Sequence, residues 1–197
     1  WAYAVGANGY CTGMVSEVLR LTASERVELT HRLVEFNAGR GVVVASVGAE
    51  STRQALAYAR EAERAGCDAM MAIPPISTAL PASEVRDYYV ALAESVRLPL
   101  IVQDASGYVG KAIPMSVNIE LLDRFGADKI LFKPEASPIG PNLSALRDGS
   151  GGRAHRGDRG GRGPAGGLAC RCARGRLFGL SIQIRARRSP ARRRPHH

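Results

Sequence analysis

The chain has 197 residues and a formal net charge of +9, and the positive charge is confined to one end. Residues 1–150 contain 14 Lys and Arg against 17 Asp and Glu, whereas residues 151–197 contain 13 Arg, no Lys and one acidic residue. The sequence therefore predicts a slightly acidic domain over residues 1–150 and a separate basic segment after it. No apolar run is long enough to cross a bilayer, so we expect no membrane partner.

The cysteines favour a reducing compartment and no metal centre. Cys11 and Cys67 lie far apart in apolar surroundings, which is typical of reduced thiols in the cytoplasm. Cys170 and Cys172 have no second pair of ligands at zinc spacing. No signal peptide opens the chain, so we expect a cytoplasmic protein.

The first elements are a strand, a helix and a second strand. A short strand is expected at residues 9–12. Thr22 and Glu25 form a capping box, which predicts a helix that begins there and ends near Asn37. The continuously apolar residues 41–47 then indicate a strand of a sheet that is covered on both faces.

The same pattern repeats along the chain. Ser51, Ser83 and Ser116 are expected to cap helices that end near residues 66, 95 and 126. The intervening strands are expected at residues 67–73, 98–103 and 129–132. Helices and strands that alternate with this period predict βαβ units and a parallel sheet, hence an α/β fold. The period alone does not distinguish an open sheet from a barrel.

A lysine follows the last of these strands. Lys133 lies at the carboxyl end of an apolar strand, and Glu135 follows two residues later. A lysine in this position is suited to attack a carbonyl carbon and form a Schiff base. The alternative is a lysine at a strand end that points into solvent.

Several segments together resemble the dihydrodipicolinate synthase/N-acetylneuraminate lyase family. Residues 13–26 contain G-M-V-S-E and L-T-A-S-E-R, similar to the family pattern G-x-x-G-E…L-T-x-x-E-R. The segment V-G-A-E-S-T at residues 47–52 resembles its G-x-G-x-x-S-T element. P-L-I-V-Q-D at residues 99–104 falls on its P-I-x-x-Y-N segment, and F-K-P-E-A-S at residues 132–137 falls on its K-E-A-S/T-G motif.

The resemblance covers roughly residues 5–148 and implies a fold and a reaction. The family fold is a (β/α)8 TIM barrel, of which residues 1–150 would supply strands two to six. Lys133 would lie on the sixth strand and form an imine with pyruvate or another 2-oxo acid. The imine itself is the electron sink, so no metal or organic cofactor is implied. The family also forms homo-oligomers, which we therefore expect here.

The sequence departs from the family at the helper residues. Met14 and Val15 replace the paired threonines, and Gln103 replaces the tyrosine that shuttles protons. Backbone amides at Val15 and Ser16 still suit a substrate carboxylate, whereas Gln103 can hydrogen-bond but cannot titrate. Proton transfer then falls to Asp104, Glu135 or Ser16. The expected catalytic residues are Lys133, Gln103 and Asp104, and the expected substrate-binding residues are Val15, Ser16 and Glu135.

Residues 151–197 contain 10 Gly and 13 Arg without a useful helical or strand period. One interpretation is a disordered arm that binds nucleic acid or another polyanion. The other is an out-of-frame reading of GC-rich DNA that begins close to Ala154. The absence of lysine favours the second, so we do not expect a nucleic-acid partner. Because strands one, seven and eight are not in this sequence, an inactive fragment of the family is a further hypothesis.

Overall fold

The computed structural model describes residues 1–13, 17–107 and 109–149. Their strands form one sheet in which every neighbouring pair is parallel and the spatial order follows the chain. The strands are β1 (Gly9–Cys11), β2 (Val42–Ser46), β3 (Ala69–Ala72), β4 (Leu100–Asp104) and β5 (Ile130–Pro134). The predicted α/β fold with a parallel sheet is thus confirmed, and the predicted basic tail lies outside the described residues.

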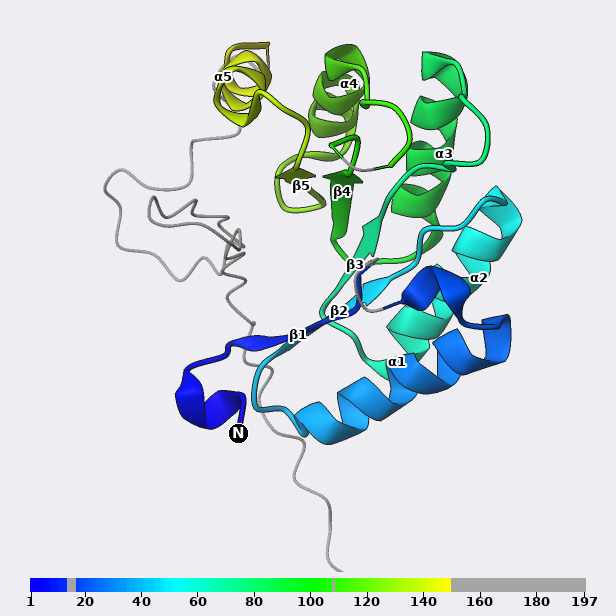
Figure 1. The fold of residues 1–197 in the computed structure, drawn as a ribbon, viewed down its shortest axis with the longest axis vertical. Helices are drawn as coiled ribbons and strands as arrows, with labels where there is room; N and C mark the ends of the chain where they lie inside the picture. The colour runs from blue at the N-terminus through cyan, green and yellow to red at the C-terminus, as the bar shows by residue number, and fades with distance from the viewer. Residues whose placement is uncertain (14–16, 108, 150–197) are drawn as a thin grey trace, which may run out of the picture.

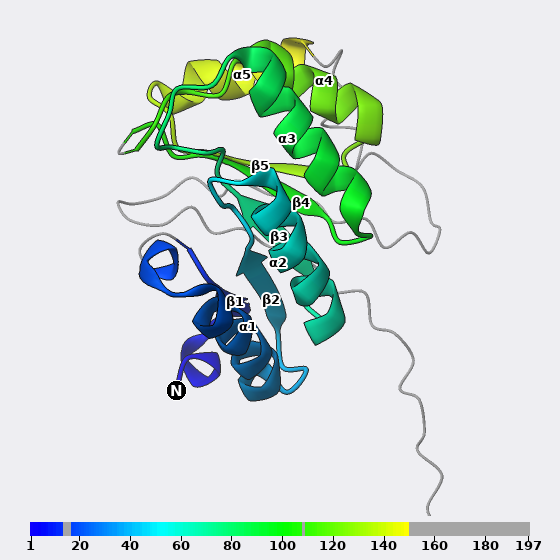
Figure 2. The same cartoon turned by 90° about the vertical axis from the view of Figure 1, so that its right-hand side faces the viewer.

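The helices form a layer along one side of this sheet (Figures 1 and 2). They are α1 (Ala23–Asn37), α2 (Thr52–Ala65), α3 (Ala82–Ser95), α4 (Met115–Phe125) and α5 (Ile139–Gly149), with short 3-10 turns at η1 (Tyr3–Val5) and η3 (Val18–Arg20). A helix follows each strand, which is the (β/α) repeat of a partial TIM barrel. Across the three described stretches, no helix combines the length and apolarity that a membrane span requires.

Strands β2 to β5 each contribute apolar residues to both faces of the sheet, as their continuous apolar runs predict. Residues such as Val43, Met70 and Leu100 pack under the helices in the main core. Their neighbours in sequence point to the other face and form a smaller buried cluster. That cluster consists of Val42, Val44, Ala69, Met71, Ile101 and Leu131.

The helix starts agree only in part with the predicted caps. Thr22 does form a capping box with Glu25, but Ser51 precedes α2 without a capping hydrogen bond from its side chain. The caps predicted at Ser83 and Ser116 are wrong, because α3 and α4 begin one residue earlier, directly after a proline. The proline carbonyl accepts the first hydrogen bond of each helix, and a fixed proline φ already suits a helix start.

The end of the described chain holds an element that the sequence did not predict. Helix α5 contains Gly140 and Pro141, which read as helix breakers. Both lie in the first turn, where a proline costs little because the N–H that it lacks has no helical partner. Strand β5 is also longer than predicted and includes Lys133 and Pro134.

Buried polar side chains tie the helices to the strand ends. Arg26 is buried on α1, and its Nη2 donates to the carbonyls of Ser46 and Gly48, 3.0 Å away in each case. The hydroxyl of Tyr89 on α3 donates to the carbonyl of Ala72 at 3.2 Å. These bonds fix the carboxyl ends of β2 and β3, the end of the sheet at which TIM-barrel sites form.

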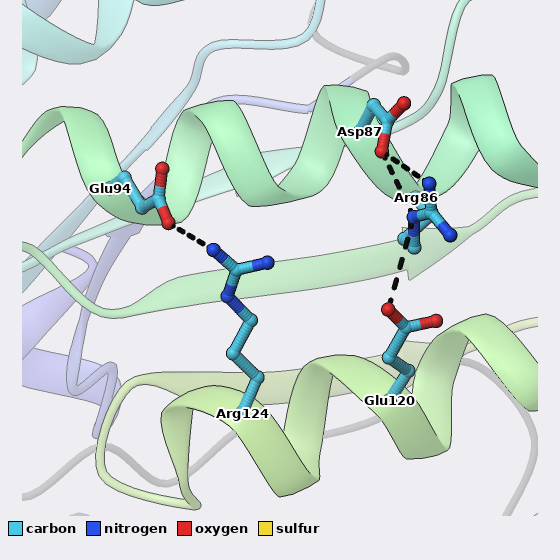
Figure 3. A network of polar contacts seen from close by, with 5 residues as sticks. All are labelled: Arg86, Asp87, Glu94, Glu120 and Arg124. Carbon is cyan, nitrogen blue, oxygen red and sulfur yellow. Dashed lines mark hydrogen bonds and ion pairs between the residues drawn. The ribbon is translucent and has the colours of Figure 1, made fainter.

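Ion pairs link two of the helices on their exposed side (Figure 3). Arg124 on α4 lies 2.6 Å from Glu94 on α3, and Arg86 on α3 lies 3.8 Å from Glu120 on α4. Arg86 also contacts Asp87 at 2.8 Å. Because these side chains are about half exposed, we expect the pairs to align the helices more than to stabilise them.

The capping box gives a first testable prediction. Thr22→Ala should lower the free energy of unfolding by about 1 kcal/mol, because the Glu25 amide loses its acceptor and the Glu25 carboxylate loses a partner. Ser51→Ala is the matched control, since Ser51 occupies the same position on α2 without a capping bond. Urea unfolding measures both, and equal losses for the two variants would contradict the assignment.

Candidate active site

Lys133 and Gln103 lie side by side on the sheet face opposite the helices. The register of β4 and β5 pairs Gln103 with Lys133 directly. Side chains alternate along a strand, so both residues share a face with Ile101 and Leu131 of the smaller apolar cluster. The predicted nucleophile therefore lies at the carboxyl end of the sheet, above an apolar floor.

Glu135 joins these two side chains. Its Oε1 lies 2.8 Å from the Nζ of Lys133, and its Oε2 accepts a hydrogen bond of 2.6 Å from the Nε2 of Gln103. The side chains of Lys133 and Glu135 are 22% and 24% exposed, and Gln103 is 3% exposed. The amine of Lys133 is thus partly accessible, and the buried amide of Gln103 holds the carboxylate of Glu135 in place.

Asp104 faces the other way. Its Oδ1 accepts a hydrogen bond from the amide of Ser106 at 3.0 Å, and its Oδ2 accepts one from the amide of Ile113 at 2.9 Å. These bonds fold the loop after β4 against the helix side of the sheet. The main-chain carbonyl of Asp104 also accepts from the amide of Glu135 at 2.9 Å. Asp104 thus supports the site from behind, and proton transfer by Asp104 stays a prediction.

Cys11 and Thr12 lie at the carboxyl end of β1, the same end of the sheet as Lys133, and were not among the predicted site residues. Partial withdrawal from water raises the pKa of the Cys11 thiol, and the positive charge of Lys133 opposes this rise. Thr12 is buried, and its Oγ1 accepts a hydrogen bond of 2.7 Å from the amide of Ser46. The sequence does not show the electrostatic effect of Lys133 on Cys11, because β1 and β5 lie far apart in the chain and are the two outer strands of the described sheet.

Val15 and Ser16, which were expected to bind a substrate carboxylate, lie outside the described residues. Glu17 follows them with a left-handed backbone, at φ 56°. Within residues 1–13, 17–107 and 109–149, no three His, Cys, Asp or Glu side chains gather in a way that would hold a metal ion.

Solved structures share this fold. A dihydrodipicolinate synthase from Acinetobacter baumannii, complexed with pyruvate, is 25% identical with a TM-score of 0.68 and covers 78% of this chain and 52% of its own. A prophage protein of the dihydrodipicolinic acid synthase family from E. coli K12, also in complex with pyruvate, is 20% identical with a TM-score of 0.70. That likeness covers 76% of this chain and 50% of the other. The described residues therefore have the fold of part of a TIM barrel, with Lys133 at the carboxyl end of its sheet.

Sequence comparison identifies the family. The profile of the dihydrodipicolinate synthetase family matches residues 5–124, more than half of the chain, and the chain belongs to this family. The 4-hydroxy-tetrahydrodipicolinate synthase of Azoarcus sp. (strain BH72) is 34% identical over 108 residues, which are 54% of this chain and 37% of the relative. An L-2-keto-3-deoxyarabonate dehydratase of Azospirillum brasilense is 31% identical over 104 residues, or 51% and 34%. The chain thus spans well under half the length of these relatives.

The support role of Asp104 can be tested by stability. Asp104→Asn should lower the free energy of unfolding by about 1–3 kcal/mol, because the two loop N–H groups bond different carboxylate oxygens and an NH2 group in place of one oxygen cannot accept. Asp87→Asn is the control, since Asp87 is exposed and forms a surface ion pair with Arg86. Urea unfolding compares the two variants, and a loss at Asp104 no larger than at Asp87 would contradict the role.

Proposed function

We propose that this chain carries the imine-forming part of a lyase or synthase that acts on pyruvate or a related 2-oxo acid. The observation that carries the proposal is the contact between Lys133 and Glu135, because a lysine must lose a proton before it attacks a carbonyl. Glu135 is the acceptor of that proton, at 2.8 Å from the amine. Gln103 holds the carboxylate in place through its second oxygen.

The chemistry follows from this arrangement. The neutral Nζ of Lys133 attacks C2 of the 2-oxo acid, a C–N bond forms, and the former carbonyl oxygen leaves as water after protonation. The protonated imine then withdraws electrons from the bonds at C3. A proton or a carbon fragment leaves C3 and an enamine forms. Glu135 is within reach to accept and return the protons of these steps.

The substrate class rests on the relatives. Two solved structures of the fold are complexed with pyruvate, and the curated relatives include both a synthase and a 2-keto acid dehydratase. Gln103 cannot serve as an acid, because an amide does not titrate usefully. A glutamine at this position supports either a different second substrate or a different proton path from those of an enzyme that depends on a tyrosine.

Three expectations complete the proposal. Val15 and Ser16 bind the substrate carboxylate through their amides, the enzyme works in the cytoplasm, and it assembles as a homo-oligomer. The competing hypothesis is an inactive fragment of the family, and it differs from the proposal in one respect. A fragment would fold around Lys133 without forming the imine.

Borohydride trapping separates the two. We expect the full chain, incubated with pyruvate and sodium borohydride, to gain a stable adduct because borohydride reduces the imine to a secondary amine. Mass spectrometry of proteolytic peptides should place the adduct on Lys133. Lys133→Arg should give none, and neither should wild-type protein without pyruvate.

Lys129 is the internal control. Its Nζ donates to the carbonyl of Leu98 at 2.7 Å, and burial lowers its pKa, so a lysine that reacts merely through a lowered pKa would label at Lys129. Circular dichroism must show that the protein is folded. Folded protein without an adduct at Lys133 would reject the proposal in favour of the inactive fragment.

A further inference from the structure

A cavity lies directly behind Lys133, on the helix side of β4 and β5. Its volume is about 120 Å³. Val102 and Phe132 form its floor, and α4 and α5 form its walls. Pro134 and Ala136, which flank Glu135, line its rim. The cavity and the imine site are therefore back to back on the same strand ends.

The polar groups in this cavity are hydrogen-bond acceptors. Asn118 on α4 is only 8% exposed, and its Oδ1 is buried without a hydrogen-bond partner among the described residues. Buried polar atoms are nearly always paired, so an orphan oxygen at a cavity indicates a missing donor. Asp104 also lines the cavity. Each of its carboxylate oxygens accepts one loop amide and has a further lone pair available.

Charge and size narrow the class of ligand. Among the described residues that line the cavity, Asp104 is the only ionisable one, so this lining has a negative charge and no positive one. The rest of the lining is largely apolar, with Met115, Leu143 and Leu146 facing the ligand space. An engineered apolar cavity of about 150 Å³ holds a benzene molecule. A ligand here must therefore be short, apolar in its body and rich in donors at one end.

We propose that this cavity binds a small primary alkylammonium ion. The ammonium head has three N–H donors, which match the Asn118 oxygen and the two oxygens of Asp104, and its charge neutralises the carboxylate. The alkyl body lies between α4 and α5 against Met115 and Leu143. The site is independent of imine formation, because it lies on the opposite face of the strands from Lys133.

Methyl NMR of the full chain tests the proposal with propylammonium chloride as the probe. We expect the methyl signals of Met115, Leu143 and Leu146 to shift and to saturate. 1-Propanol should bind about tenfold more weakly, because charge-assisted hydrogen bonds are about twice as strong as neutral ones. Propionate should leave these signals unchanged. Absent or non-saturating shifts, or equal affinity for all three probes, would mean that water alone fills the cavity and would overturn the proposal.

Two variants define the site. Asn118→Leu should weaken propylammonium about tenfold by removing the orphan acceptor at similar volume. Glu84→Gln is the matched control, since it removes a carboxylate from a different surface hollow, lined also by Glu50 and Asp87, and should leave the affinity unchanged. Equal losses in both variants would overturn the proposal in favour of non-specific charge attraction. If Asn118→Leu fails to fold, the wild-type series of three probes decides alone.

Discussion

The candidate active site depends on the carboxylate of Glu135, which contacts side chains from two neighbouring strands. Glu135 lies 2.8 Å from the amine of Lys133 and accepts a 2.6 Å hydrogen bond from Gln103. An ion pair alone would leave the carboxylate free to rotate, and the buried amide removes that freedom. The main chain of Glu135 is fixed as well, because its amide donates to Asp104 at 2.9 Å. In the proposed reaction, the amine of Lys133 and the carboxylate that accepts its proton are therefore preorganised without a tyrosine.

The alternation of side chains along parallel strands explains why so few residues organise both sides of the sheet. Gln103 and Lys133 face the side opposite the helices, whereas Val102, Asp104 and Phe132 face the helices and line the cavity. Asp104 connects the two sides, since its carboxylate orders the loop after β4 and its carbonyl holds Glu135. The candidate active site and the cavity thus use adjacent residues of β4 and β5 on opposite faces of the sheet.

Much of this fold follows from local sequence, and much of the site does not. Continuous apolar runs and the Thr22 capping box predict the strands and α1, because burial and helix capping act over a few residues. Helix α5 was missed because Gly140 and Pro141 read as breakers until their place in the first turn is known. Lys133 was predicted as the nucleophile from its position at the end of an apolar strand. The hydrogen bond between Glu135 and Gln103 was not predicted, because only the register of β4 and β5 brings Gln103 beside Lys133 and Glu135.

The most direct measurement is the exchange of pyruvate methyl protons for deuterium in D2O, followed by proton NMR. Exchange requires both the imine at Lys133 and a group that moves protons, and it needs no second substrate. We expect exchange with the wild-type chain, none with Lys133→Arg, and a rate about 10²-fold lower with Glu135→Gln. Glu94→Gln, which removes a carboxylate from the helix layer, should exchange at the wild-type rate. Exchange by Glu135→Gln at the wild-type rate would contradict the assignment of Glu135 as the proton acceptor.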